Sequence, residues 1–221
     1  MDDKGILHQY LSTRRASLLG KLDGLSEYDA RRPMTPTGTN LLGLVKHVAS
    51  VELDYFGLVF GRPSGRSLPW LSDEAEPDAD LWAAPEETRE EIIELHHFAA
   101  AHTDATVAAL PLDASGEVPW WPEERRRVTL HQILVHMCVE TAHHLGHADI
   151  LRELIDGSAG QRPGDSNLSV RSLEEWVAHR ARLEAAASEA AVREEAACEA
   201  TARDDAGRQA TATAAIPLGQ A

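Results

Sequence analysis

The sequence contains few cysteines, and their arrangement does not make a disulfide framework. Cys138 and Cys198 are the only two among 221 residues, and they lie far apart. Residues 1–5 also lack the charged-then-apolar pattern that opens a secretory signal. Together these absences predict a protein of a reducing cytoplasm.

Basic residues and long apolar runs are scarce as well. The chain has 21 Lys and Arg against 36 Asp and Glu, a formal net charge of −15. Nucleic-acid binders need a basic face and anionic membranes attract basic segments, so this balance predicts neither kind of partner. No apolar run approaches the roughly 18 residues of a spanning helix. With 43% hydrophobic residues, the chain can bury one sizeable core or at most two small ones.

Apolar residues recur at helical spacing in five segments, and no run alternates in the way that strands require. Thr39 or Asn40 can cap the second helix and Ser172 the fifth, while Gly157 can end the fourth. The expected helices are 4–24, 41–60, 86–110, 129–156 and 173 to about 197. Since the first four are long and joined by two longer crossings, the sequence predicts an all-α four-helix bundle with the fifth helix packed outside.

The expected organisation is a bundle with its accessory fifth helix over residues 1–185, followed by an Ala-rich tail, 186–221. Little in the tail can be buried, so it is expected to fray and then to be disordered. The acidic run 73–80 lies in a long loop and is interpreted as a solvated segment. The tryptophans outside the last helix are expected to pack at the bundle ends; they are Trp70, Trp82, Trp120 and Trp121.

Histidine is the residue type that is present in excess. The chain has 11, and helix 129–156 alone carries His131, His136, His143, His144 and His147. Side chains four residues apart share a helix face, so Glu140 falls in line with histidines on both sides. A carboxylate beside an apolar stripe is costly unless it is paired or metal-bound. Three pairs with this spacing remain open, His136/Glu140, Glu140/His144 and His143/His147, and so does an ordinary hydrogen-bonded role for each histidine.

A possible third ligand lies in the second helix. His47 sits next to the apolar stripe of segment 41–60 and could reach helix 129–156 if the two helices are neighbours. Two imidazoles and a carboxylate can hold zinc with an open position, and the same set suits ferrous iron or nickel.

Two segments carry a resemblance to a known family. Residues 35–49 and 135–153 resemble the DinB/YfiT-like metalloprotein superfamily, and they are most similar to its mini-circle-type branch, near the N-terminal domain of the mycothiol-dependent maleylpyruvate isomerases. The resemblance covers about residues 5–185 and implies a four-helix bundle. It also implies a metal triad of His, Glu and His, which falls here on His47, Glu140 and His144.

The resemblance further implies thiol chemistry. Relatives are S-transferases or isomerases that use a small thiol, bacillithiol or mycothiol, so the expected cofactors are a divalent metal, zinc or else nickel or iron, and such a thiol. A metal-bound thiol loses its proton and becomes a nucleophile toward a small electrophile. The isomerases carry a further C-terminal domain that this chain does not match, so their specific activity is not implied.

Four further residues are candidates for supporting roles. His147 and Asp149 could orient a ligating imidazole, and His136 lies one turn before Glu140. Arg152, like Arg125–Arg127, could hold a carboxylate of the thiol, although a surface ion pair is an equal alternative for Arg152. Cys138 is expected to be an inert core thiol.

The sequence thus predicts a divalent-metal-binding protein that acts as a metal-dependent thiol S-transferase on small electrophiles. Two alternatives stay open. The first is a non-catalytic bundle that binds metal or a ligand in a stress response. The second is a purely structural helical homodimer, paired through an exposed apolar face.

Overall fold

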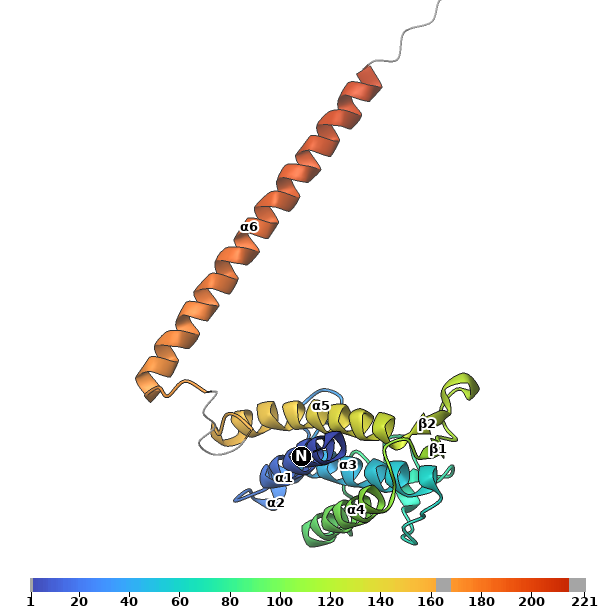
Figure 1. Ribbon diagram of the computed structural model, residues 1–221. Helices are drawn as coiled ribbons and strands as arrows, with labels where there is room; N and C mark the ends of the chain where they lie inside the picture. Colours follow the sequence, from blue (N-terminus) through green and yellow to red (C-terminus); the bar gives the residue numbers. More distant parts are fainter. Residues whose placement is uncertain (1, 162–167, 215–221) are drawn as a thin grey trace, which may run out of the picture. The chain divides into compact units, whose positions relative to one another are not determined.

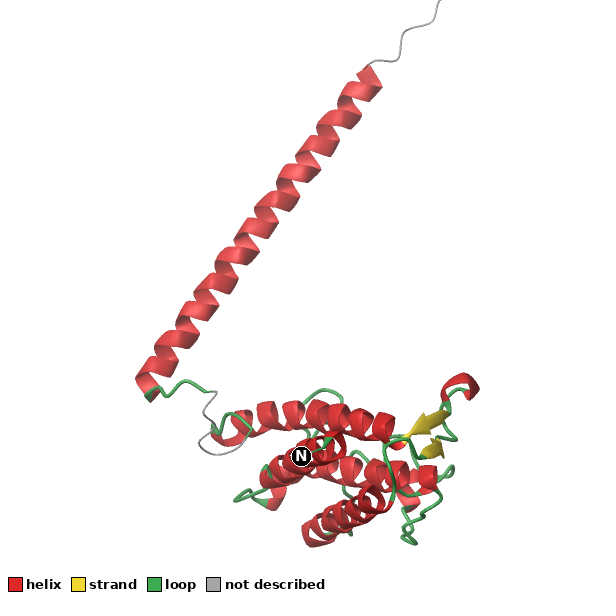
Figure 2. Ribbon diagram, viewed as in Figure 1, coloured by secondary structure: helices red, strands yellow, loops and turns green. Residues whose placement is uncertain are grey.

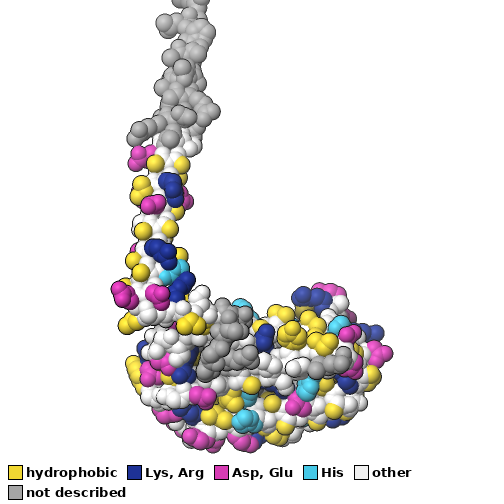
Figure 3. Space-filling model, turned by 60° about the vertical axis from the view of Figure 1, so that its left-hand side comes forward, with side chains coloured by type: hydrophobic (Ala, Val, Ile, Leu, Met, Phe, Trp, Pro, Cys, Tyr) yellow, Lys and Arg dark blue, Asp and Glu magenta, His cyan; other side chains and the backbone are white. Residues whose placement is uncertain are grey.

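The computed structural model describes residues 2–161 and 168–214, which are mostly helical (Figures 1 and 2). The chain divides into two compact units, Met1–Leu168 and Ser169–Ala221. Figure 3 shows one face of the first unit, on which acidic and basic side chains are interspersed among hydrophobic ones. Within the described ranges, no helix is both long enough and apolar enough to span a membrane.

Four long helices form the first unit. They are α1 (Asp3–Gly20), α3 (Leu41–Phe56), α4 (Arg89–Ala109) and α5 (Leu130–Asp156). Helix α1 packs against α4 and α5, and α3 packs against the same two helices, so α1 and α3 lie diagonally across the bundle. The predicted all-α four-helix bundle is confirmed, and α3 and α5 are neighbours.

The helix boundaries follow from their caps. Asn40 accepts a hydrogen bond from the Gly43 amide and begins α3, and Gly157, in the left-handed region at φ 78°, ends α5. Helix α4 begins three residues later than the pattern predicted, because Thr88 and Glu91 form a reciprocal capping box.

Two small elements depart from the prediction. Helix α2 (Glu27–Arg31) was not expected, and a two-stranded antiparallel sheet pairs β1 (Ser115–Glu117) with β2 (Arg127–Thr129). The expectation of no strands was therefore wrong. Three-residue strands are too short to show alternation, and this hairpin is held through the burial of Val118 and Val128 at one end of the bundle.

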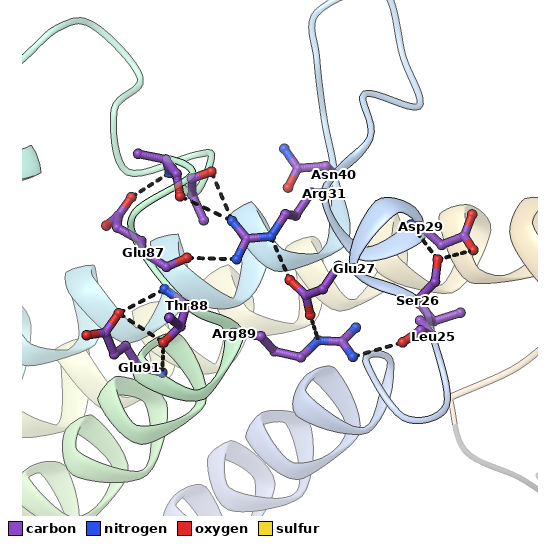
Figure 4. Close-up of polar contacts among 12 residues, drawn as sticks. Leu25, Ser26, Glu27, Asp29, Arg31, Asn40, Glu87, Thr88, Arg89 and Glu91 are labelled. Atoms are coloured by element: carbon purple, nitrogen blue, oxygen red, sulfur yellow. Dashed lines mark hydrogen bonds and ion pairs between the residues drawn. The ribbon is translucent and has the colours of Figure 1, made fainter.

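The long connection between α3 and α4 contains the 3-10 helices η1 (Leu58–Phe60) and η2 (Pro69–Leu71). Helix α2, which precedes α3, binds the end of this connection. Arg31 donates to the carbonyls of Ala83, Ala84 and Glu87 at 3.3, 3.2 and 2.7 Å (Figure 4). Arg31 also pairs with Glu27, which in turn pairs with Arg89 of α4. The end of the connection is thereby fixed against the bundle.

A buried ion pair crosses the bundle interior. Arg15 of α1 lies 2.7 Å from Glu52 of α3, and the two side chains are 3% and 1% exposed. Arg15 also pairs with Asp104 of α4 at 2.8 Å. Burial raises the pKa of Glu52, and the charge of Arg15 opposes that rise. Each charge is compensated, which is the condition for charges to lie inside a bundle.

The second unit consists of α6 (Leu173–Ala214). Ser172 caps it, accepting from the Glu175 amide while its own amide donates to the Glu175 carboxylate. The helix continues past the expected end near residue 197, because this stretch is rich in alanine, the strongest helix former. The last part of the expected tail, 215–221, lies outside the described residues. Packing of this helix outside the bundle stays a prediction.

Candidate metal centre

Three side chains from two helices converge on the seam between α3 and α5. Nε2 of His47 lies 3.4 Å from Oε1 of Glu140, and Nε2 of His144 lies 3.1 Å from the same oxygen. One ligand atom from each residue falls within 4.8 Å of the others, and the described part of the chain holds no second such group of three. His144 and Glu140 meet because they are one helical turn apart, whereas His47 depends on α3 being a neighbour.

The spacing of these atoms fits a metal ion. Zinc binds imidazole nitrogen at about 2.0–2.1 Å, so adjacent tetrahedral ligands lie about 3.3–3.4 Å apart. The distances from Oε1 of Glu140 to the two imidazole nitrogens, 3.1 and 3.4 Å, are close to that ligand–ligand separation. All three side chains are partly accessible, at 16%, 29% and 13% exposure in the order His47, Glu140, His144. A small molecule could therefore approach the cluster from solvent.

Electrostatics also favour positive charge between these groups. Hydrogen bonds with His144 and His47 hold the pKa of Glu140 far below its usual range, against the opposing effect of burial. Burial alone would lower the pKa of His47, but its contacts with Asp80 and Glu140 outweigh burial and raise that pKa to about 9. Two carboxylates therefore face this imidazole, and either a proton or a metal cation can balance them.

Asp80 is a site residue that the sequence interpretation missed. Its Oδ2 accepts a hydrogen bond from Nδ1 of His47 at 2.5 Å, and this contact lowers the pKa of Asp80. A carboxylate on the far nitrogen of a ligating histidine fixes the ring's tautomer and orientation. Asp80 is the last residue of the acidic run 73–80 that was interpreted as solvated, and nothing in its local pattern indicates which helix it meets.

Lys46, the neighbour of His47, holds this loop in place. Its side chain is 2% exposed, and Nζ donates to the carbonyls of Ala79 and Trp82, both at 2.9 Å, and pairs with Glu87 at 2.8 Å. Nζ also lies 4.2 Å from the ring centroid of Trp70. The sequence held one sign that a loop packs here, namely a lysine within the apolar stripe of α3. A buried lysine needs hydrogen-bond partners from elsewhere in the chain.

A glycine permits the loop to approach α3. A Cβ placed on Gly43 would lie 1.8 Å from the carbonyl oxygen of Leu81. The side-chain Nδ2 of Asn40 donates a hydrogen bond to that same oxygen at 3.2 Å. The close approach seats the Leu81 backbone directly on α3, one residue away from Asp80.

His136 lies one turn before Glu140 but belongs to an aromatic cluster. Its ring centroid is 4.7 Å from that of Tyr55 and 5.1 Å from that of Trp121. The Tyr55 hydroxyl accepts hydrogen bonds from the indoles of Trp121 and Trp120 at 3.1 and 3.4 Å. Burial lowers the pKa of His136, which favours the neutral ring. The structure therefore places His136 beside the three-residue cluster and not in it.

His147 also lies beside the cluster. It is exposed, and its ring centroid is 5.5 Å from that of His144 and 4.3 Å from that of His143. These are edge-to-face ring contacts, so the interaction with His144 is packing between rings and not the hydrogen bond expected of an orienting group.

The structure does not bring Asp149 and Arg152 to the cluster. Asp149 pairs with Lys21 of α1 at 2.8 Å, whereas Arg152 pairs with Asp156 at 2.7 Å and donates to the Lys21 carbonyl. Five and eight residues beyond His144, the helix has turned these positions toward α1. The ion-pair alternative for Arg152 is the one that the structure shows. Arg152 and Lys21 instead help to line a cavity of about 730 Å³ between α1 and residues 158–161.

Comparison with known proteins adds the family. The family model described as mycothiol S-transferase matches residues 6–157, which cover the four-helix bundle except the first residues of α1 and include both helices of the three-residue cluster. A search of curated proteins finds no match. Since residues 6–157 make up more than half of the 221-residue chain, the chain belongs to the mycothiol S-transferase family.

Proposed function

We propose that this protein is a metal-dependent S-transferase that joins a small thiol of the mycothiol type to a small electrophile. The observation that carries the proposal is the meeting of His47, Glu140 and His144 on the α3–α5 seam of a chain from this family. In the proposal these three residues are the metal ligands. Zinc suits two imidazoles and one carboxylate, and nickel or ferrous iron could take the same donors.

The residues around the ligands prepare them for a cation. Asp80 accepts a hydrogen bond from Nδ1 of His47, and Nε2 of that ring faces Glu140. The low pKa of Glu140 keeps its carboxylate ionised at neutral pH. Lys46 fixes the segment that carries Asp80, so the position of His47 is set by groups that are themselves held.

Three protein ligands leave a coordination position open, which is typical of catalytic and not of structural zinc sites. A divalent cation held there supplies the charge that favours the thiolate form of a thiol at neutral pH. In the transfer, the thiol proton goes to solvent, the sulfur forms a bond to the electrophilic carbon, and the leaving group departs with its electron pair. The partial exposure of all three ligands leaves both substrates a route from solvent.

A conjugation assay tests the proposal. Metal-loaded protein is mixed with mycothiol and monochlorobimane, and the fluorescent conjugate is measured before and after chelation. We expect metal-dependent conjugation that Glu140→Gln abolishes. The matched control is Glu153→Gln, which removes an exposed carboxylate from the same helix and should leave the rate unchanged.

One result would overturn the proposal. If the metal-loaded protein conjugates none of several thiols with any of several electrophiles, the chain is not a transferase. Tight metal binding without turnover would then identify a non-catalytic metal-binding bundle.

A further inference from the structure

Two histidines outside the three-residue cluster lie on adjacent turns of α5. His143 and His147 are both exposed, and their ring centroids are 4.3 Å apart at an interplanar angle of 73°. Among the described residues, their ring contacts are with each other and with His144, and neither ring takes part in an ion pair. Their nitrogens therefore remain available to a ligand from solvent.

The spacing of this pair suits a metal ion. Side chains at positions i and i+4 of a helix lie one above the other, with Cβ atoms about 5–6 Å apart. Two imidazole nitrogens that share one ion need to lie about 3.3 Å apart. Because both rings face solvent and already touch, side-chain rotation alone can bring a nitrogen of each to that separation. Imidazole is a ligand that zinc, copper and nickel all accept.

The surroundings add a reason for a cation to arrive there. The ring centroids of His143 and His147 lie 5.3 and 5.5 Å from that of His144. The chain carries a net charge of −15, which raises the local concentration of cations around it. An ion held by the exposed pair would thus lie next to one of the three clustered ligands and still be open to solvent.

We propose that His143 and His147 form a second, bidentate site that captures a divalent cation such as Zn²⁺ or Cu²⁺ from solvent. Water completes the coordination, since two protein ligands leave the remaining positions open. With fewer protein ligands, this outer site binds more weakly than the cluster of His47, Glu140 and His144. The outer site does not depend on transferase activity.

Zinc titration calorimetry of the metal-free, full-length chain tests the site. We expect a tight and a weak binding event in the wild type, and loss of the weak event in both His143→Ala and His147→Ala. The matched control, His131→Ala, removes an exposed histidine from the same helix and should retain both events. A weak event that survives in both single variants with unchanged affinity would overturn the proposal.

A second measurement isolates the outer site from the inner one. In His47→Ala, Cu²⁺ should give an electron paramagnetic resonance spectrum with two nitrogen ligands, and adding His147→Ala should remove that signature. Circular dichroism establishes that each variant is folded. If the two-nitrogen signal persists without His147, the outer site is refuted. A protein that shows this signal but never conjugates a thiol would refute the proposed function and leave the outer site standing.

A third measurement tests whether the outer site, His143 and His147, captures zinc that then reaches the inner site, His47, Glu140 and His144. Zinc transfer from a chromogenic chelator to the inner site should be slower in His147→Ala than in His131→Ala. Equal transfer rates in these two variants would overturn the capture role.

Discussion

Nδ1 of His47 donates a hydrogen bond to Oδ2 of Asp80 at 2.5 Å, so a residue of the acidic loop 73–80 orients a side chain that lies between α3 and α5. The contact links two segments 33 positions apart in the chain. It joins the loop to the candidate metal centre, because the ring that Asp80 holds presents its other nitrogen to Glu140. The loop is therefore part of the site.

Asp80→Asn should weaken metal binding by about 10–100-fold, the usual effect of removing a carboxylate from a ligating histidine. An asparagine cannot provide the negative charge that favours the oriented ring. Competition with a chelator of known affinity measures the change. Asp78→Asn is the control, since Asp78 is exposed and its positive φ of 61° is one that asparagine tolerates. Equal affinities in the two variants would contradict a supporting role for Asp80.

Gly43→Ala should destabilise the protein by about 1–3 kcal/mol, because the new methyl group collides with the Leu81 backbone. Displacing that backbone also shifts Asp80, so metal affinity should fall with stability. Gly146→Ala provides the opposite case: it lies in α5 with open space around it, and alanine there should stabilise by about 0.5–1 kcal/mol. Urea unfolding of the metal-free variants measures both effects. If Gly43→Ala is as stable as the wild type, the loop does not pack as described.

His96 should make stability fall in mild acid. Its side chain is 3% exposed with no hydrogen-bond partner on either nitrogen, and burial, with the nearby charge of Arg15, lowers its pKa from 6.5 to about 4. Between these values the unfolded chain binds a proton that the folded chain does not. Stability should therefore decrease as pH falls from 6.5 to 4, by about 3 kcal/mol.

The variant His96→Leu removes this titration and should flatten the pH dependence by that amount. His131→Leu, at an exposed position, should keep the wild-type slope. Urea unfolding of metal-free protein at several pH values gives the comparison. Parallel curves for His96→Leu and the wild type would show that His96 is not held neutral in the fold.

The sequence was most informative where one helix contained the whole pattern. The spacing of Glu140 and His144 placed both on one face of α5, and Gly157 ended that helix as predicted. Spacing left three such pairs open, and the resemblance selected Glu140 and His144 among them, with His47 as the third residue. The structure brings these three residues together because α3 and α5 are neighbours.

Contacts made by loops and by the far side of a helix could not be predicted in this way. Asp80 meets His47 only because Lys46 and Gly43 seat the loop on α3, and no local pattern encodes that register. Asp149 and Arg152 share α5 with Glu140 and His144 but lie on the side of the helix that faces α1. There Lys21 provides partners that the sequence alone did not indicate.

Whether His47, Glu140 and His144 hold a metal ion is measured by elemental analysis of protein purified without an affinity tag and dialysed to remove weakly held ions. We expect one zinc, nickel or iron ion per chain in the wild type and none in Glu140→Gln or His144→Ala. Chelation should lower the melting temperature of the wild type alone. A wild-type protein that holds no metal, and whose melting temperature changes neither with chelator nor with added zinc, would rule out a metal site at these residues.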